Sequence, residues 1–353
     1  MPVLLPSVVS AHVDTDRLRT HVLHLDRGGE PVVFVHGLLA SSVFWQRTML
    51  ALPERYRPVA LDLRGFGDTE RAPIDGARGL EDFCDDVVAL LDALGLERVH
   101  LVGWSMGGAV SATVLRRAPE RVRSLTVVNP VSPYGFGGTH GADGELNHPS
   151  GAGSGGGCAD PGFAARIAEG DRSDDSPSSP RQVLTTTYVA PGWQPEDPSD
   201  VEMYVDSVLA SAVGEDHYPG DVATTEAWPG VAPGRKGVLN ALSPLHMRWD
   251  DLPRIDPKPP VRWIRGTHDA VISDTSMFDT AHLGSLGAVP GWPGADAAPA
   301  QPMVAQTRAV LEAYAAAGGS YEEHVIECGH TPQIERPEEF MAALLPHLEA
   351  AER

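Results

Sequence analysis

The sequence predicts an α/β fold in which a mostly parallel sheet carries helices on both faces and one large segment is inserted. Short β-branched runs that end at Gly or Pro predict strands buried on both faces, as parallel strands are. Helical patterns lie between these runs, and the repeated order of strand and helix predicts the layered sheet. The alternation stops between about residues 131 and 250, which predicts the insertion.

Each element is predicted by its own local pattern. The apolar run PVVFV, 31–35, stops at His36-Gly37 and is typical of a strand. The stretch 80–94 places its apolar residues on one helical stripe, and Gly95 supplies a C-terminal stop. By the same criteria strands are expected at 31–35, 57–63, 99–102, 122–129, 259–266 and 321–327, and helices at 80–94, 106–117, 181–189, 199–213, 301–317 and 337–351.

The limits of this alternation divide the chain into three parts. We expect the first part of the sheet domain over residues 1–130, an inserted cap or lid over 131–250, and the second part of the sheet domain over 251–353. The insertion begins with a Gly-rich, aperiodic stretch and is too long for a plain loop of a compact domain. A disordered surface insertion is the alternative.

Composition limits the function classes. The 353 residues carry a net charge of −21, which argues against a nucleic-acid partner and against docking to an anionic membrane, since both need a basic face. Cys84, Cys158 and Cys328 are unevenly spaced without a CxxC pair, so neither a disulfide framework nor a zinc site is expected. No run approaches the roughly 18 apolar residues of a membrane helix. The N-terminus is a poor signal peptide, so a cytoplasmic protein is expected.

The stretch GWSMG, residues 103–107, matches the pattern G-x-S-x-G between an expected strand and an expected helix. This sharp turn forces its serine, Ser105, into strained backbone geometry, while the flanking glycines remove side chains that would collide. The helix that follows directs its first N–H groups and its positive end at the serine. We interpret Ser105 as a nucleophile, and a merely structural turn is the alternative.

A serine nucleophile needs a base, and the base needs a carboxylate to fix its tautomer. His330 follows the last expected strand, and Asp269 follows the strand at 259–266. Parallel strands present their C-terminal ends at one edge of the sheet, so both residues are expected near Ser105. A surface or capping role for His330, and Asp274 as the carboxylate, are the alternatives.

Acyl transfer also needs hydrogen-bond donors for the oxyanion that develops. The N–H of Met106, directly after the nucleophile, is the first candidate. The second is the N–H of Leu38 in VHGLLAS, because Gly37 lets the chain turn after the strand at 31–35. A plain strand-ending turn is the alternative for this loop.

The chain resembles the α/β-hydrolase superfamily in a set of motifs that stand in the family's order. These are HG after the strand at 31–35, DLRGFGDT after the next strand, GWSMGG at the nucleophile turn, and then GTHDAVIS and CGHTPQIERPEEF. The resemblance covers about residues 1–130 and 258–351. It implies Ser105 as nucleophile, Asp269 as triad acid, His330 as base, and Leu38 and Met106 as oxyanion donors.

A serine at the nucleophile position favours hydrolysis of a carboxylic ester, lactone or thioester through an acyl-serine intermediate. An aspartate there would have indicated an epoxide hydrolase or a haloalkane dehalogenase, and HGLLAS lacks the loop pattern of proline iminopeptidases. The fold runs several reactions. A C–C bond hydrolase, a cofactor-free haloperoxidase, an acyltransferase or cyclase of secondary metabolism, and a non-catalytic ligand-binding homologue are the alternatives.

The cap is expected to select a small-molecule acyl substrate. An extra Gly/Pro-rich loop at 277–300 departs from the family's spacing and bears on the shape of the pocket, not on the triad. Trp104 flanks the nucleophile, and Trp193 and Trp228 lie in the insertion, so these three are the expected substrate-binding residues. Packing of the insertion's aromatic residues into a small core of their own is the alternative. No metal or organic cofactor is expected, and the sequence does not indicate an oligomeric state.

Overall fold

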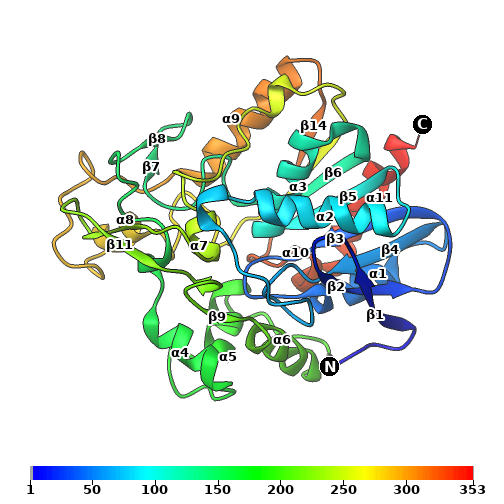
Figure 1. Cartoon of the computed structure of the whole chain (residues 1–353), viewed down its shortest axis with the longest axis horizontal. Coiled ribbons are helices and arrows are strands. Elements are labelled where there is room, and N and C mark those ends of the chain that lie inside the picture. The colour runs from blue at the N-terminus through cyan, green and yellow to red at the C-terminus, as the bar shows by residue number, and fades with distance from the viewer. Residues whose placement is uncertain (1–2, 353) are drawn as a thin grey trace.

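The computed structural model describes residues 3–352 and has an eight-stranded sheet at its centre (Figure 1). The strand order is β1-β2-β4-β3-β5-β6-β13-β14, in which β2 pairs antiparallel with β1 and β4 and all other neighbours are parallel. The predicted mostly parallel sheet is therefore confirmed. The strands are β1 (Val8–Asp14), β2 (Arg19–Leu25), β3 (Glu30–Val35), β4 (Tyr56–Leu61), β5 (Val99–Trp104), β6 (Val122–Val128), β13 (Val261–Gly266) and β14 (Tyr321–Ile326).

The first two strands carry no signal of the kind that predicts the other six. β1 forms an edge of the sheet, and most of its side chains are exposed or half-buried, so it has no continuous apolar run. β2 is buried but places the polar residues Thr20 and His21 among its inward positions. Because its buried positions include polar side chains with long-range hydrogen-bond partners, β2 does not show the continuous apolar run from which a buried strand is predicted.

Helices cover both faces of the sheet, and alternate residues of β3 show the two cores that result. Val33 and Val35 pack in the core that includes α2, α3 and α9, whereas Val32 and Phe34 pack in the core that includes α1 and α11. This arrangement confirms the expected helices on both faces. These helices are α1 (Gln46–Ala51), α2 (Glu81–Ala93), α3 (Met106–Arg117), α9 (Met303–Ala316), α10 (Pro332–Glu335) and α11 (Pro337–Ala351).

Between β6 and β13 the chain forms a lobe of short helices and two-stranded ladders beside the sheet (Figure 1). The lobe joins both cores, since Phe163 packs in the core with α2 and α3 while Tyr204 packs in the core with α1 and α11. Its helices are α4 (Pro161–Glu169), α5 (Pro180–Val183), a π-helix over Leu184–Tyr188, α6 (Ser199–Leu209) and α7 (Val238–Ala241). Its ladders pair β7 (Thr139–His140) with β8 (Glu145–Leu146), β9 (Val213–Gly214) with β10 (Tyr218–Pro219), and β11 (Val222–Thr224) with β12 (Val231–Pro233).

Polar contacts hold the Gly-rich part of this lobe together. The buried Asn240 accepts hydrogen bonds at Oδ1 from the N–H groups of Gly156 and Gly234, both at 2.9 Å, and donates from Nδ2 to the carbonyl of Asp221 at 2.8 Å. A Cβ at Gly155 would lie 2.5 Å from Asn240 Oδ1, so that position has room only for glycine. Glycines here serve close packing, which is why the stretch looks unstructured when only its composition is considered.

The extra loop at 277–300 packs against the same lobe (Figure 1). It contains α8 (Thr280–Ser285), whose N-cap Asp279 also accepts a 2.7 Å hydrogen bond at Oδ2 from the N–H of Gln301. Gln301 in turn accepts from the N–H of Gly137 in the lobe at 2.6 Å. Burial raises the pKa of Asp279 above its ordinary value.

Two observations bear on the expectations about cysteines and membrane helices. The three cysteines are all free thiols, and Cys84 and Cys328 are buried. Over residues 3–352, none of the helices is both long enough and apolar enough to span a bilayer.

Candidate active site

Ser105 occupies the sharp turn between β5 and α3, with φ 57° and ψ −121°. A positive φ is costly for any residue other than glycine, so the surrounding packing must impose it. A Cβ at Gly103 would lie 2.1 Å from the carbonyl oxygen of Gly107, and a Cβ at Gly107 would lie 2.3 Å from that of Val35. Only glycines allow the strand, the turn and the helix to approach this closely, which is the local reason for the sequence GWSMG.

A buried hydrogen bond joins the two other residues that the sequence singles out. His330 Nδ1 lies 2.8 Å from Asp269 Oδ2, and the two side chains are 1% and 3% exposed. Asp269 Oδ1 accepts from the N–H groups of Val271 and Ile272 at 2.7 and 2.9 Å, which fixes the carboxylate in a tight turn. Asp274, the alternative carboxylate, is exposed and instead accepts from the first turn of α9.

Two side chains anchor the His330 loop beside the serine turn. The indole N–H of Trp104, the neighbour of Ser105, donates to the carbonyl of His330 at 2.7 Å. The amide of Asn129, at the end of β6, donates to the same carbonyl at 2.9 Å and accepts from the N–H of Gly266 at 3.0 Å. Asn129 thereby ties the ends of β6, β13 and β14 together, which is how an amide rather than a carboxylate contributes at that strand end.

The loop after β3 lies directly on the serine turn. A Cβ at Gly37 would be 3.0 Å from the Cβ of Ser105, so glycine is needed for the close approach. Within residues 3–352, the N–H groups of Leu38 and Met106 donate no hydrogen bond to the protein, which leaves both as candidate donors for an oxyanion. The hydroxyl of Ser105 likewise makes no hydrogen bond to His330 in this part of the chain, and catalytic contacts of this kind often close only when substrate binds.

The side chain of His36 holds the loop after β3 in place. The N–H of Leu63 donates to His36 Nε2 at 2.9 Å, so Nε2 is an acceptor and the proton of the neutral ring sits on Nδ1. Nδ1 lies 2.7 Å from the carbonyl of Gly37 and donates to it. Burial lowers the pKa of His36, although the nearby Asp62 carboxylate opposes this, and the ring is therefore held neutral as a structural link.

The lobe reaches the site through the end of its π-helix. The carbonyl of Tyr188 accepts from the N–H of His330 at 2.9 Å, and the Tyr188 hydroxyl donates to the carbonyl of Leu38 at 3.2 Å. The Tyr188 ring also meets the rings of Trp104 and His330 edge-on, with centroids 6.0 and 5.6 Å apart. One lobe residue thus contacts both the loop that carries the base and the loop that carries the candidate oxyanion donor.

The buried carboxylate of Glu335, in α10, completes this link. Its Oε2 accepts from the N–H of Ala190 in the lobe at 2.7 Å and from the N–H of Gly329 at 2.9 Å. Its Oε1 accepts from the N–H of Thr331 at 3.1 Å and from the hydroxyl of Thr331 at 3.0 Å. We call Tyr188, Ala190 and Glu335 the lobe clasp, because they fasten the lobe to both sides of His330.

The expected substrate-binding tryptophans lie in three different settings. Trp104 is fully buried and holds the His330 loop. Trp193 is half-buried in a turn that follows Ala190. Trp228 donates from Nε1 to the carbonyl of Pro290 at 2.9 Å and lines a cavity of about 230 Å³ between the lobe and the 277–300 loop. Neither Ser105 nor the His330–Asp269 pair lines that cavity.

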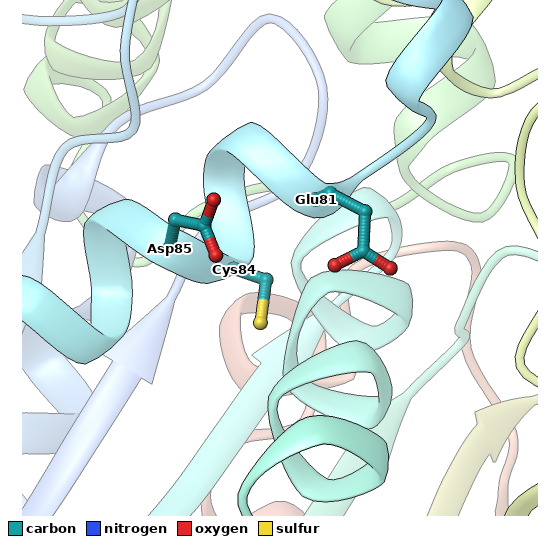
Figure 2. Close-up of side chains that lie close together, drawn as sticks. All are labelled: Glu81, Cys84 and Asp85. Atoms are coloured by element: carbon teal, nitrogen blue, oxygen red, sulfur yellow. The ribbon is translucent and has the colours of Figure 1, made fainter.

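A second cluster, on α2, has the residue types of a metal site. Figure 2 shows Glu81, Cys84 and Asp85 close together, with candidate ligand atoms within 4.8 Å of one another. Both carboxylates already pair with arginines, Glu81 with Arg117 at 2.8 Å and Asp85 with Arg78 at 3.0 Å. Burial raises the pKa of the Cys84 thiol to about 12, so it stays protonated, whereas a metal ligand must be a thiolate. The cluster therefore fits a network of ion pairs better than a metal.

Comparisons with known proteins agree with this geometry. Residues 30–147 match a family model described as alpha/beta hydrolase fold. The chain is 43% identical over 101 residues to the dihydrolipoyllysine-residue acetyltransferase component of an acetoin cleaving system from Pseudomonas putida, covering 29% of this chain and 27% of that protein. It is 39% identical over 102 residues to the putative carbamate hydrolase RutD from Caulobacter segnis, covering 29% and 38%. The chain thus spans about a quarter to two fifths of the length of these relatives.

The crystal structure of an enol-lactonase from Burkholderia xenovorans superimposes on 96% of this chain and 100% of its own, with a TM-score of 0.59 and 17% identity. At that identity the likeness concerns the fold alone. The strand order, the serine turn and the family-model match over residues 30–147 agree on one class of fold, and this chain has the α/β-hydrolase fold.

Proposed function

We propose that this protein is a serine hydrolase that cleaves a carboxylic ester, lactone or thioester through an acyl-serine intermediate on Ser105. The observation that carries the proposal is the buried 2.8 Å contact between His330 and Asp269, anchored through Trp104 to the strained turn that holds the serine. Hydrolases among the relatives and the superfamily fold support the reaction class.

In the first half of the reaction His330 Nε2 takes the proton of Ser105 while Oγ attacks the acyl carbon. An ionised Asp269 only accepts hydrogen bonds, so His330 carries its proton on Nδ1 and keeps the Nε2 lone pair free. The N–H groups of Leu38 and Met106 stabilise the oxyanion. His330 then protonates the leaving group, and in the second half it activates the water that cleaves the acyl-enzyme.

The test is the hydrolysis of a short-chain 4-nitrophenyl ester by the Ser105→Ala variant. We expect kcat/KM to fall by on the order of 10⁴-fold, since the acyl-enzyme no longer forms. The matched control is Ser285→Ala, which removes an exposed serine hydroxyl in α8. An unchanged rate in Ser105→Ala would contradict the proposal, and products formed with an added alcohol in place of water would redirect it to acyl transfer.

A further inference from the structure

A second hydrogen-bonded series of serine, histidine and aspartate lies toward the β1 edge of the sheet, on β1, on β2 and just after β4. Ser10 Oγ on β1 is 2.8 Å from His21 Nε2 on β2, and His21 Nδ1 is 2.7 Å from Asp62 Oδ2, just after β4. His21 and Asp62 are buried, whereas Ser10 is exposed on the edge strand. These residues are separate from Ser105, His330 and Asp269, and neither the fold nor the proposed function uses them.

The hydrogen-bond directions in this series follow from the ionisation state of the Asp62 carboxylate. Asp62 is buried, which opposes its ionisation, but the hydrogen bonds that it accepts from His21 and from the backbone N–H of Ser42 hold the pKa of Asp62 below its ordinary value. An ionised carboxylate only accepts, so His21 Nδ1 donates to it. In the neutral ring Nε2 is then the acceptor, and the hydroxyl of Ser10 donates to it.

The surroundings hold His21 and Asp62 in place. Asp62 also accepts from the N–H groups of Ser42 at 2.6 Å and Asp68 at 2.9 Å. The backbone N–H of His21 donates to the hydroxyl of Thr69 at 2.7 Å. The base and its carboxylate are therefore preorganised, while the serine stands at an open sheet edge that an acyl donor can reach.

We propose that Ser10 is a second nucleophile, which accepts an acyl group from small activated esters and thioesters. Ser10 Oγ forms a bond to the acyl carbon as the bond to the leaving group breaks. The hydroxyl proton passes to His21 Nε2, the imidazolium is stabilised by Asp62, and the leaving group receives that proton. The product is an ester on Ser10, a covalent modification at the sheet edge remote in sequence from the proposed active site.

The lobe supplies a matched comparison in the same molecule. Ser150 Oγ lies 2.8 Å from His148 Nδ1, so this serine also has a histidine partner. Among the described residues 3–352, no carboxylate forms an ion pair with His148, unlike His21. Ser150 is half-buried and its hydroxyl also contacts Thr225 Oγ1 at 3.2 Å, so its reactivity serves as the reference for a serine whose histidine has no carboxylate partner.

The experiment treats the Ser105→Ala protein with 4-nitrophenyl acetate and follows acetylation of Ser10 and Ser150 by peptide mass mapping. We expect Ser10 to be acetylated at least about tenfold faster than Ser150, because a positioned base contributes rate only where its tautomer and charge are fixed. Ser105→Ala combined with Ser10→Ala should lose this modification, and Ser10→Ala alone should leave ester turnover at Ser105 unchanged.

A third variant, Ser105→Ala with His21→Gln, should reduce acetylation of Ser10 to the rate at Ser150. His21 is buried, so circular dichroism must first show that this variant is folded. If it does not fold, the ratio of Ser10 to Ser150 within Ser105→Ala decides the question alone. Equal or slower acetylation of Ser10 in that protein overturns the proposal and leaves its hydrogen bond to His21 as a structural contact.

Discussion

The two sets of serine, histidine and aspartate, one around Ser105 and one around Ser10, differ most in the backbone geometry that holds the serine. Ser105 sits in a strained turn at φ 57°, beside the N–H groups of Leu38 and Met106, for which residues 3–352 provide no acceptor, whereas Ser10 sits in a regular edge strand. The hydrogen bonds behind Ser10 are 2.8 and 2.7 Å long, whereas Ser105 is flanked by the lobe clasp and by the candidate oxyanion donors Leu38 and Met106. A base and a carboxylate are thus a small part of a catalytic site, and the turn and the donors around the serine distinguish the two.

The carboxylates provide the largest expected contrast. Asp269→Asn should lower kcat for ester hydrolysis by about 10³- to 10⁴-fold, because an amide favours the wrong tautomer of His330 and cannot stabilise the imidazolium. Steady-state kinetics on a 4-nitrophenyl ester measure it. Asp274→Asn is the matched control, since Asp274 is exposed and contacts only the backbone of α9, and it should stay within about twofold of the wild type. Equal losses in both variants would break the assignment.

Asp62 should behave in the opposite manner, affecting stability more than turnover. Asp62→Asn should lower the free energy of unfolding by about 2–3 kcal/mol, because one buried carboxylate accepts from His21, Ser42 and Asp68. Urea denaturation measures the loss. Asp68→Asn, an exposed neighbour whose backbone alone contacts Asp62, should change it by less than about 0.5 kcal/mol.

The difference in unfolding free energy between wild type and Asp62→Asn should depend on pH with a definite sign. The pKa of Asp62 is lower in the folded state than its ordinary value of 3.8. Its contribution is therefore fully present above pH 3.8 and is lost as the pH falls through the folded-state pKa. The difference in unfolding free energy between wild type and Asp62→Asn should shrink below pH 3.8, and a difference that grows there would contradict the ionised relay.

Glu335 tests the lobe clasp beside Ser105. Glu335→Gln replaces an oxygen that faces N–H groups with an amide N–H₂, so the His330 loop should shift relative to Ala190. We expect kcat to fall about 10- to 100-fold with a smaller change in KM, as for a misplaced base. Glu338→Gln, on the exposed first turn of α11, is the control. A change in KM alone would assign Glu335 to substrate binding instead.

The smallest effect is expected from the tyrosine of the clasp. Tyr188→Phe removes one hydroxyl, which donates to the carbonyl of Leu38 at 3.2 Å, but keeps the ring against Trp104 and His330. The loss of one hydrogen bond corresponds to about two- to fivefold in kcat/KM. Wild-type kinetics in this variant would mean that the Leu38 loop is positioned by His36 alone.

The sequence predicts the serine turn and most strands because those features are local. A buried run followed by GWSMG, or an amphipathic stretch ended by Gly95, carries its structure within a few residues. Asp269 and His330 are also predictable, because parallel strands bring their ends together whatever lies between them. The bond between them confirms that the two strand ends meet, although their catalytic roles stay predictions.

Contacts that span most of the chain could not be predicted in this way. Asn129 binds the carbonyl of His330, which lies 201 residues further on, and Glu335 binds Ala190, 145 residues away. No periodicity encodes such partners. The one available signal was position, since Asn129 follows a strand at the same sheet edge as Ser105 and Glu335 stands five residues after His330.

Covalent labelling of the wild-type protein with a fluorophosphonate, followed by mass mapping of the labelled residue, tests most directly whether Ser105 is the nucleophile. We expect rapid, stoichiometric labelling at Ser105 together with loss of ester hydrolysis, while Ser10, which lies in a regular edge strand and not in a strained turn, reacts far more slowly. Rapid inactivation with the label at any other residue, or full ester turnover with Ser105 labelled, would contradict it.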